Sequence, residues 1–195
     1  IHGRLLIFRA ERRSGDGVID FNGKWTRITR EIPEWRTLAE FLRYDLGLIG
    51  TKIGCNEAEC GICTVLVDGI PVNSCIYPAL RAGGSQITTI EGLAHGEQLY
   101  QLDPLQHEFI HHGAVQCGFC TPGLIMTARA LLNENLTPSE DDIKHALKDT
   151  YCRCTGYTSV IRAIQSAARV ERGESAVPPA IPETDHQDLK VVGQS

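Results

Sequence analysis

Alternating apolar and polar positions open the regular part of the chain. Residues 18–23 ("VIDFNG") and 24–32 ("KWTRITREI") both carry the two-residue period of a strand. The Asn22-Gly23 pair between them is typical of a hairpin turn. Residues 37–47 ("TLAEFLRYDLG") then space their apolar side chains as a helix does, and the helix is expected to end at Gly47.

Three more short strands follow, at 64–68, 70–75 and 86–90, with a turn at Asp68-Gly69 and a short helix near 76–82. These elements predict a compact α+β unit that ends near Gly92. Between its helix and its second hairpin lies a cysteine-rich loop, which has no regular period.

Helical spacing replaces the strand period in the second half of the chain. Four segments carry it: 103–114, 121–135, 139–149 and 157–171. Thr121 with Pro122, and Ser139 ahead of Asp142, are typical of helix starts. Short connections between the four segments predict a small all-α bundle.

The change of period predicts the domain organisation. We expect an N-terminal extension over 1–16, with "LLIF" at 5–8 as a candidate edge strand. An α+β domain over 17–92 and a helical domain over 93–171 follow, and the Pro-rich residues 172–195 are expected to form a linker or tail.

Composition excludes several classes of protein. The net charge of −5 argues against a nucleic-acid surface, and no apolar run approaches the ~20 residues that span a bilayer. No secretory signal is visible at the N-terminus, so a cytoplasmic location is expected. In that compartment the eight cysteines are expected to bind metal or to carry out redox chemistry rather than to form disulfides.

The first cysteine group is Cys55, Cys60, Cys63 and Cys75, within and after the stretch "GCNEAECGICTVLVDG". Its C-x4-C-x2-C order with one later cysteine is the ligand spacing of plant-type [2Fe–2S] centres. Gly54 and Gly61 would let the loop curl tightly and point its N–H groups at an anionic centre. The spacing favours iron–sulfur over zinc, because four-cysteine zinc sites usually come as two C-x2-C pairs; zinc and disulfides remain the lesser alternatives.

The second cysteine group is Cys117, Cys120, Cys152 and Cys154, a C-x2-C pair and a C-x-C pair. Each pair is predicted at a helix N-terminus, where the helix dipole stabilises thiolates. A disulfide between the pairs is the alternative, and a Rieske centre is excluded because no histidine is suitably paired with these cysteines. Two complete four-thiolate sets leave no cysteine over.

Four ordered motifs resemble one family closely: "TKIGCNEAECGICTVLVDG", "QITTIEGL", "AVQCGFCTPG" and "CRCTGY". The family is the iron–sulfur subunit of the molybdenum hydroxylases, a group that includes xanthine dehydrogenase, aldehyde oxidoreductase and carbon monoxide dehydrogenase. The resemblance covers about residues 17–170. Asn56 and Ala58 stand where the family often has glycine, and Ile62 where it often has alanine.

The resemblance implies a fold and a set of cofactors. The N-terminal domain would be a β-grasp plant-type ferredoxin whose [2Fe–2S] cluster is held by Cys55, Cys60, Cys63 and Cys75. The all-α four-helix-bundle domain would hold a second [2Fe–2S] cluster through Cys117, Cys120, Cys152 and Cys154. Electrons would pass from a molybdopterin cofactor in a large partner chain through the second cluster and then the first, to an FAD-binding subunit or another acceptor. Gln116 and Cys154 would contact the pterin.

The remaining polar candidates have plainer interpretations. His107, His111 and His112 share one predicted helix and are expected to face solvent rather than bind metal. Lys52 either offsets cluster charge or is solvated, and Glu57 with Glu59 suits a docking rim. The segment 188–195 ("DLKVVGQS") resembles the start of the molybdopterin-binding chain, so we expect either that the chain continued into that region, in a fused gene or before a break, or that the tail is an arm lying over the partner.

Two functions follow from these patterns. The first is an electron-transfer subunit with no substrate site of its own, because no Ser/His/Asp arrangement, P-loop or G-x-G-x-x-G motif is present. The alternative is a free-standing two-cluster redox carrier or iron-dependent sensor. The substrate of a complex would be chosen in the partner chain.

Overall fold

The computed structural model describes residues 18–23, 26–83, 85–94 and 102–177. The candidate edge strand at 5–8 and the tail segment at 188–195 lie outside these residues. The described chain is a mixed structure in which small antiparallel sheets and short helices precede four longer helices.

The first hairpin is present, but Asn22 and Gly23 belong to its first strand. Strand β1 (Val18–Gly23) pairs antiparallel with β2 (Thr26–Glu31), and the ladder closes on the pair Gly23 and Thr26. Asn22 pairs with Arg27 within that ladder. The expectation of a turn at Asn22-Gly23 was therefore wrong, because both residues pair with the second strand.

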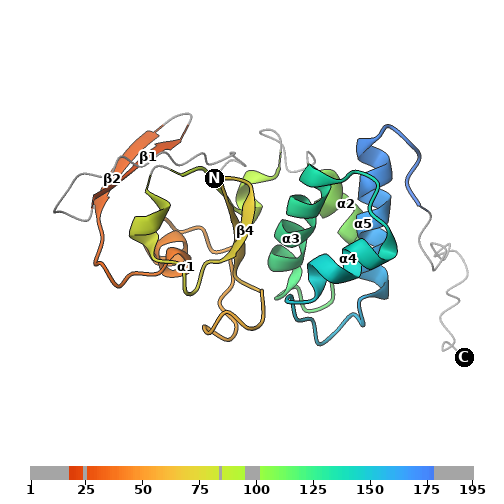
Figure 1. Ribbon diagram of the computed structural model, residues 1–195, viewed down its shortest axis with the longest axis horizontal. Coiled ribbons are helices and arrows are strands. Elements are labelled where there is room, and N and C mark those ends of the chain that lie inside the picture. The colour runs from red at the N-terminus through yellow and green to blue at the C-terminus, as the bar shows by residue number, and fades with distance from the viewer. Residues whose placement is uncertain (1–17, 24–25, 84, 95–101, 178–195) are drawn as a thin grey trace, which may run out of the picture.

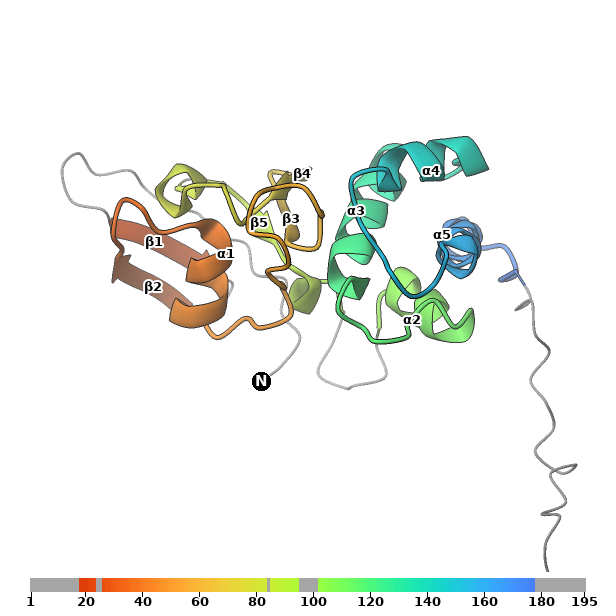
Figure 2. The same cartoon turned by 90° about the horizontal axis from the view of Figure 1, so that it is seen from below.

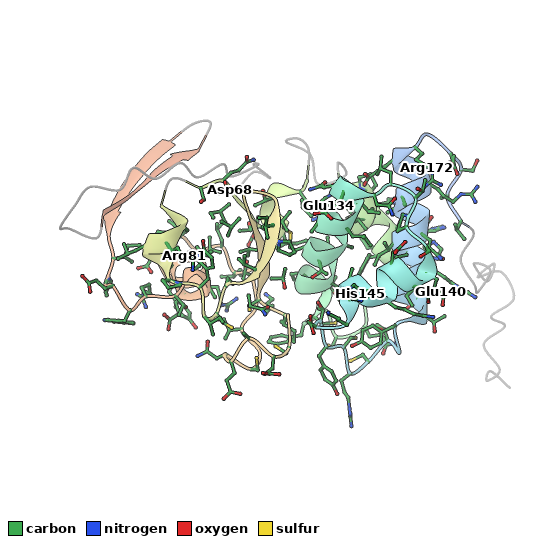
Figure 3. The ribbon with its side chains drawn as sticks, viewed as in Figure 1. Asp68, Arg81, Glu134, Glu140, His145 and Arg172 are labelled. Atoms are coloured by element: carbon green, nitrogen blue, oxygen red, sulfur yellow. The ribbon has the colours of Figure 1, made fainter. Side chains whose placement is uncertain are left out.

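A three-stranded antiparallel sheet follows, in the order β4-β3-β5. Strand β3 (Thr64–Val67) lies in its centre and is wholly buried, while β4 (Ile70–Asn73) and β5 (Ile87–Thr88) flank it. Asp68 and Gly69 turn between β3 and β4 with φ of 52° and 82°, the left-handed pair that a tight hairpin requires. The Asp68 side chain (Figure 3) also accepts a 2.7 Å hydrogen bond from the N–H of Gln86, which fixes the approach to β5.

The predicted first helix forms as α1 (Leu38–Glu40) and continues as the π-helical η1 (Phe41–Asp45). Thr37 and Glu40 make a capping box at its start. Its apolar face buries Leu38, Phe41 and Leu42 against the sheet, in a core that also contains Val65 and Ile87. The short 3₁₀ helices η2 (Ala79–Ala82) and η3 (Ile90–Gly92) complete this half.

All four helices predicted in the second half are present. They are α2 (Pro104–His111), α3 (Thr121–Glu134), α4 (Glu140–Leu147) and α5 (Thr158–Glu171). Pro122 sits in the first turn of α3, and Ser139 with Asp142 forms a capping box on α4, as predicted. Their shared core includes fully buried Leu105, Phe109, Leu124, Ile143 and Ile164.

The two halves meet along α3. Figures 1 and 2 both show α3 between the sheet and the other three helices, and it packs against β3. Ile62 lies just before β3 and Leu66 lies within it. Both belong to the hydrophobic core of the helical half. The contact is close: a Cβ added to Gly123 on α3 would lie 2.7 Å from the carbonyl oxygen of Gly61. This interface brings the two cysteine-bearing regions together.

Across the residues that the structure describes, no helix combines the length and the apolar character needed to cross a membrane.

Candidate functional site

The first cysteine group converges beside the buried end of β3. Cys63 and Cys75 are 1% and 3% exposed, whereas Cys55 and Cys60 lie on a half-exposed loop. Cys63 is held by its backbone, since its carbonyl accepts a 2.5 Å hydrogen bond from the Ser74 hydroxyl. Ser74 in turn is tied to the first helix, because its own carbonyl accepts a 3.0 Å bond from Ala39 N–H. The hairpin therefore brings Cys75 back to the loop, as the sequence predicts.

The loop that carries Cys55 and Cys60 curls through repeated left-handed residues. Asn56, Ala58 and Gly61 have φ of 61°, 62° and 62°. Asparagine tolerates this conformation and glycine prefers it, but an alanine there is strained. The two departures from family glycine noted in the sequence thus fall at positions where the fold needs left-handed backbone.

Backbone N–H groups of the same loop point at its thiols. Glu57 N lies 3.3 Å from Cys55 Sγ, and Cys55 N lies 3.4 Å from Cys60 Sγ. The hydrogen bond from the Glu57 backbone is the main reason that the pKa of Cys55 is lowered to about 7. Donors aimed at sulfur are what an anionic iron–sulfur centre requires, so the arrangement fits such a group.

The buried Cys63 thiol responds in the opposite direction. Burial, with the neighbouring Cys75 thiol adding to it, raises the pKa of Cys63 to about 12. A metal centre would displace this proton on binding, as thiolate ligation generally does. The four thiols and the inward N–H groups are a suitable donor set for one [2Fe–2S] cluster.

The second cysteine group has two buried and two exposed members. Cys120 and Cys152 are 7% and 6% exposed, whereas Cys117 and Cys154 are exposed. The sulfur atoms of Cys117 and Cys154 lie 3.6 Å apart although 37 positions separate them in sequence. Burial, followed by the neighbouring Cys152 thiol, raises the pKa of Cys120 to about 12. The two pairs predicted to act together are therefore brought together.

The helix-terminus prediction holds for one of these pairs. Cys120 is the N-cap residue of α3, so the positive end of that helix faces the second cysteine group. Cys154 is not at the start of α5, whose N-cap is Tyr157 with a left-handed φ of 67°. Helix α5 begins where the sequence predicts, and a short turn separates its N-cap from Cys154.

Tyr157 holds the second loop in place, which the sequence did not predict. Its hydroxyl accepts a 2.7 Å hydrogen bond from Cys152 N and donates a 3.0 Å bond to the carbonyl of Thr150. Burial alone would raise the pKa of Cys152, but hydrogen bonds from the Thr155 hydroxyl and from backbone N–H groups outweigh it and lower that pKa. No spacing rule identifies such a tyrosine, because its role depends on the loop closing over it.

One hydrogen bond joins the two cysteine groups directly. Tyr151 N donates a 2.9 Å bond to the carbonyl of Cys60. Tyr151 precedes Cys152 in the chain, so one backbone hydrogen bond connects a cysteine of the first group with a cysteine of the second. The two sites are neighbours across the interface made by α3 and β3.

Gln116 lies next to this exposed edge. It is exposed, as are Cys117 and Cys154, so both residues predicted to contact a pterin are accessible from outside the chain. Exposed apolar side chains lie within three positions of these residues in the chain: Val115, Phe119 and Tyr151 are 39%, 45% and 50% exposed. This surface is therefore apolar as well as cysteine-bearing.

The other polar candidates have mixed outcomes. The His107 side chain is 66% exposed, as expected, and that of His112 is only 1% exposed, so the expectation of a solvent-facing His112 was wrong. Lys52 donates a 2.7 Å bond to the carbonyl of Ile49 rather than reaching a thiol. Glu57 and Glu59 are exposed on the first cysteine loop.

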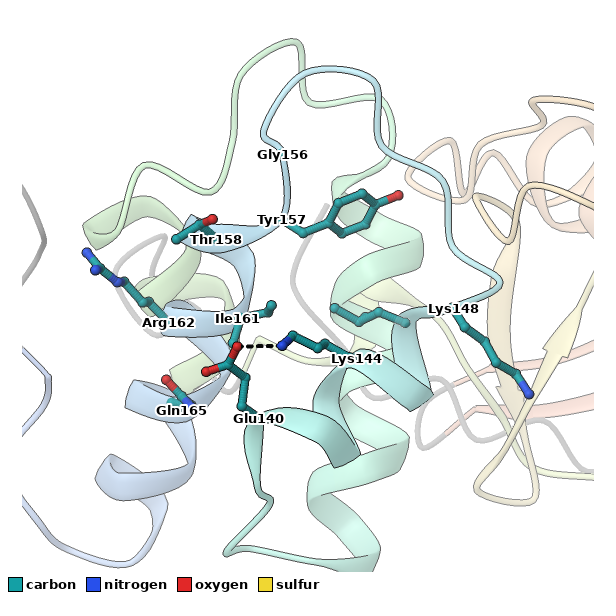
Figure 4. Close-up of a pocket in the computed structure, with 10 residues that line it drawn as sticks. Glu140, Lys144, Lys148, Gly156, Tyr157, Thr158, Ile161, Arg162 and Gln165 are labelled. Carbon is teal, nitrogen blue, oxygen red and sulfur yellow. Dashed lines mark ion pairs between the residues drawn. The ribbon is translucent and has the colours of Figure 1, made fainter.

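A groove between α4 and α5 borders the second cysteine loop through Tyr157 (Figure 4). Its walls include Lys144, Lys148, Tyr157, Ile161 and Arg162, and no cysteine lines it. Glu140 and Lys144 form a 2.7 Å ion pair across its rim. Nothing in its lining suggests a catalytic role.

Comparison with known families identifies both cysteine regions. Residues 19–83 match the family model described as a 2Fe-2S iron-sulfur cluster binding domain, and residues 89–165 match a [2Fe-2S] binding domain. The chain is thus a protein with two [2Fe–2S]-binding domains.

Relatives with curated descriptions extend over nearly all of the described region. The nicotinate dehydrogenase small FeS subunit of Eubacterium barkeri is 44% identical over 154 residues, which is 79% of this chain and 94% of that protein. The nicotine 6-hydroxylase small subunit of Paenarthrobacter nicotinovorans is 42% identical, over 76% of this chain and 87% of that protein. The aldehyde oxidoreductase of Megalodesulfovibrio gigas is 43% identical over 76% of this chain, but the match spans only 16% of that much longer protein.

A solved structure gives the same result. A chain of quinoline 2-oxidoreductase from Pseudomonas putida 86 superimposes with a TM-score of 0.73 at 42% identity, covering 80% of this chain and 97% of that one. The present chain belongs to the family of iron–sulfur subunits of the molybdenum hydroxylases.

Proposed function

We propose that this chain is the electron-transfer subunit of a molybdenum hydroxylase complex. It would carry electrons from the molybdopterin site of a large partner chain to an FAD-binding subunit or another acceptor, and it would have no substrate site of its own. The observation that carries this proposal is the pairing of two four-thiol groups joined by the hydrogen bond from Tyr151 N to the carbonyl of Cys60.

We assign the ligands by group. Cys55, Cys60, Cys63 and Cys75 would hold one [2Fe–2S] cluster, and Cys117, Cys120, Cys152 and Cys154 the other. When bound, each cluster supplies one-electron redox chemistry. The chain's own residues curl around the clusters, direct N–H groups at sulfur and keep one face of the second cysteine group accessible.

The proposed domain organisation follows the matched regions. A β-grasp ferredoxin domain over 17–92 and a four-helix-bundle domain over 93–171 would lie between the extension 1–16 and the tail 172–195. The family matches at 19–83 and 89–165 support this division. We also propose that the complex acts in the cytoplasm.

The ligand assignment is tested by iron and sulfide assay together with EPR of the reduced protein. Two clusters require two irons and two sulfides for each of the two matched domains, and two distinguishable signals. Replacing Cys75 with serine should remove one signal, and replacing Cys120 with serine the other. Loss of both signals from each variant, with the chain still folded, would contradict two separate ligand sets.

A subunit and a free-standing carrier differ in surface. The exposed Val115, Phe119 and Tyr151, each close in the chain to a cysteine of the second group, favour a subunit, because large apolar side chains at a docking face are covered by the partner. Gel filtration of the native protein, read at flavin and cluster wavelengths, separates the two. Elution as a monomer without a large chain would favour the carrier.

We further propose that Gln116 and Cys154 face the pterin. An amide offers both a donor and an acceptor to a pterin edge, and Cys154 is an exposed member of the second cysteine group. In the assembled complex, Gln116→Leu should slow cluster reduction by substrate while iron content and both EPR signals persist. Asn133→Leu, an amide replacement on α3, is the control. Reduction of the Gln116 variant at the control rate would reject this assignment.

A further inference from the structure

Helix α2 ends in a group of ionisable side chains that electron transfer does not use. Its members are Glu108, His111 and His112, hereafter the His–Glu site, and one ligand atom from each lies within 4.8 Å of the other two. None belongs to either cysteine group. The Glu108 side chain is 4% exposed, so a carboxylate has been taken out of water here.

The Glu108 carboxylate is oriented from both sides. His107 Nδ1 lies 2.9 Å from Oε1, and the buried Ser166 hydroxyl on α5 donates a 2.6 Å hydrogen bond to Oε2. His112 Nε2 lies 3.5 Å from that same Oε2. The carboxylate is thereby fixed with one oxygen toward the His112 ring.

His112 is the unusual member. Its side chain is 1% exposed, yet neither ring nitrogen makes a hydrogen bond of normal geometry with any described residue. The backbone of Val177 also acts on the ring and raises the pKa of His112. A buried imidazole without such bonds normally costs free energy, so the ring nitrogen aimed at Glu108 requires an explanation.

The distance between His112 and Glu108 provides one. At 3.5 Å it is too long for an ordinary N–H···O hydrogen bond. Two donor atoms that each lie about 2.0–2.1 Å from one tetrahedral zinc ion are about 3.3–3.4 Å apart. The two side chains are therefore spaced as neighbouring ligands of one ion.

We propose that Glu108, His111 and His112 form a binding site for a divalent transition-metal ion of the zinc type. His111 is half-buried and supplies the third ligand from the side open to solvent. Water or another small ligand would complete a tetrahedral set. Imidazole and carboxylate donors suit zinc, and no thiolate takes part.

The protonation states suit this role at neutral pH. Burial lowers the pKa of His112, although Glu108 opposes the shift, so the ring stays neutral and available as a ligand. Burial alone would raise the pKa of Glu108, but hydrogen bonds from Ser166 and His107 outweigh it and lower that pKa. Both ligands are thus ready to bind a cation without first losing a proton.

The site is structural rather than hydrolytic. Residues 107–111 read His-Glu-Phe-Ile-His, which matches the H-E-x-x-H pattern of zinc peptidases. In that pattern both histidines bind zinc and the glutamate acts as a base, whereas here the His107 ring is 66% exposed and contacts Glu108. The glutamate is instead aimed at His112, and so it is a ligand.

An ion here would tie together three parts of the helical half. Glu108 and His112 lie at the end of α2, and Ser166 belongs to α5. Val177 N donates a 2.9 Å bond to the Ser166 hydroxyl, which links the segment after α5 to the same network. Metal binding would therefore stabilise the path along which the chain leaves α5.

Zinc binding is tested on the full chain with both iron–sulfur clusters in place. After dialysis against a chelator, equilibrium dialysis with radioactive Zn²⁺ gives stoichiometry and affinity, and zinc X-ray absorption reports the ligand atoms. We expect one zinc per chain with only nitrogen and oxygen neighbours. A rise of several degrees in thermal midpoint on adding zinc should accompany binding.

Variants make the result specific. His111→Ala should weaken zinc binding by at least about tenfold, because a ligand is lost. His145→Ala, on the outer face of α4 (Figure 3), removes an exposed histidine and should leave binding unchanged. Because His111 is half-exposed, its variant is expected to fold, and intact cluster absorbance verifies this.

Three results would overturn the proposal: no bound zinc in the wild-type chain, sulfur neighbours of the zinc, or equal affinity in the His111 and His145 variants. None of them bears on the electron-transfer proposal, since the His–Glu site shares no residue with the cysteine groups.

Discussion

Gly123 offers the sharpest test of how the two halves are joined. It lies in the first turn of α3, where the helix meets the loop that precedes β3. A Cβ added there would lie 2.7 Å from the carbonyl oxygen of Gly61, and 2.8 and 2.9 Å from the backbone O and Cα of Ile62. All three neighbours are backbone atoms, so none can move away by changing a rotamer.

The magnitude follows from these distances. Ordinary contact begins near 3.4 Å, so α3 and the loop must separate by roughly 0.7 Å to admit one methyl group. Overpacking of this kind costs about 1–3 kcal/mol, whereas replacing a helical glycine with alanine gains at most about 1 kcal/mol. We expect Gly123→Ala to lower the free energy of unfolding by about 1–2 kcal/mol.

The assay compares urea midpoints, followed by far-ultraviolet circular dichroism and by the visible absorbance of the clusters. Glu134→Ala, at an exposed position of the same helix, is the control, because it adds no atom to a packed contact. The reasoning fails if Gly123→Ala is as stable as the wild type, or if the control loses as much stability.

Three further predictions concern loops and caps. Ala58→Gly should raise the free energy of unfolding by about 1 kcal/mol, because φ at this position is 62° and glycine adopts this left-handed conformation without strain. Unchanged or reduced stability in chemical unfolding would count against that explanation. Tyr157→Phe removes the two hydrogen bonds that the hydroxyl makes to the second cysteine loop, each worth about 0.5–1.5 kcal/mol. It should lower stability and alter only the EPR signal of the second cluster. An unchanged signal with unchanged stability would show that these bonds do not hold the loop. Hydrogen bonds from the Ser139 hydroxyl and backbone lower the pKa of Asp142, so the stability they add is present at neutral pH and is lost as pH falls through that lowered pKa. NMR titration of Ser139→Ala should show the Asp142 pKa rising toward its ordinary value, and no rise would exclude the cap as its cause.

The sequence by itself predicted the four helices of the second half and the division of the cysteines into two groups. Cys55, Cys60 and Cys63 lie close in the chain, so their spacing alone indicates a metal loop. The helices were predictable because apolar residues such as Leu105 and Phe109 recur at the helical period, and because Ser139 with Asp142 is a local capping signal. In each case the relevant residues are near neighbours in sequence, so their interactions need no knowledge of the fold.

The tertiary structure decided what depends on distant segments. Periodicity shows that one face of a helix is apolar, but it does not show which polar side chain the packing will cover. The His112 side chain was expected in solvent and is buried. Tyr157 holds the second cysteine loop because the loop before it folds back over its hydroxyl. The meeting of Tyr151 with Cys60 likewise arises only when α3 packs on β3, since 91 positions separate them in the chain. Such contacts are set by how the two cores fit together, and a pattern within one segment cannot specify that fit.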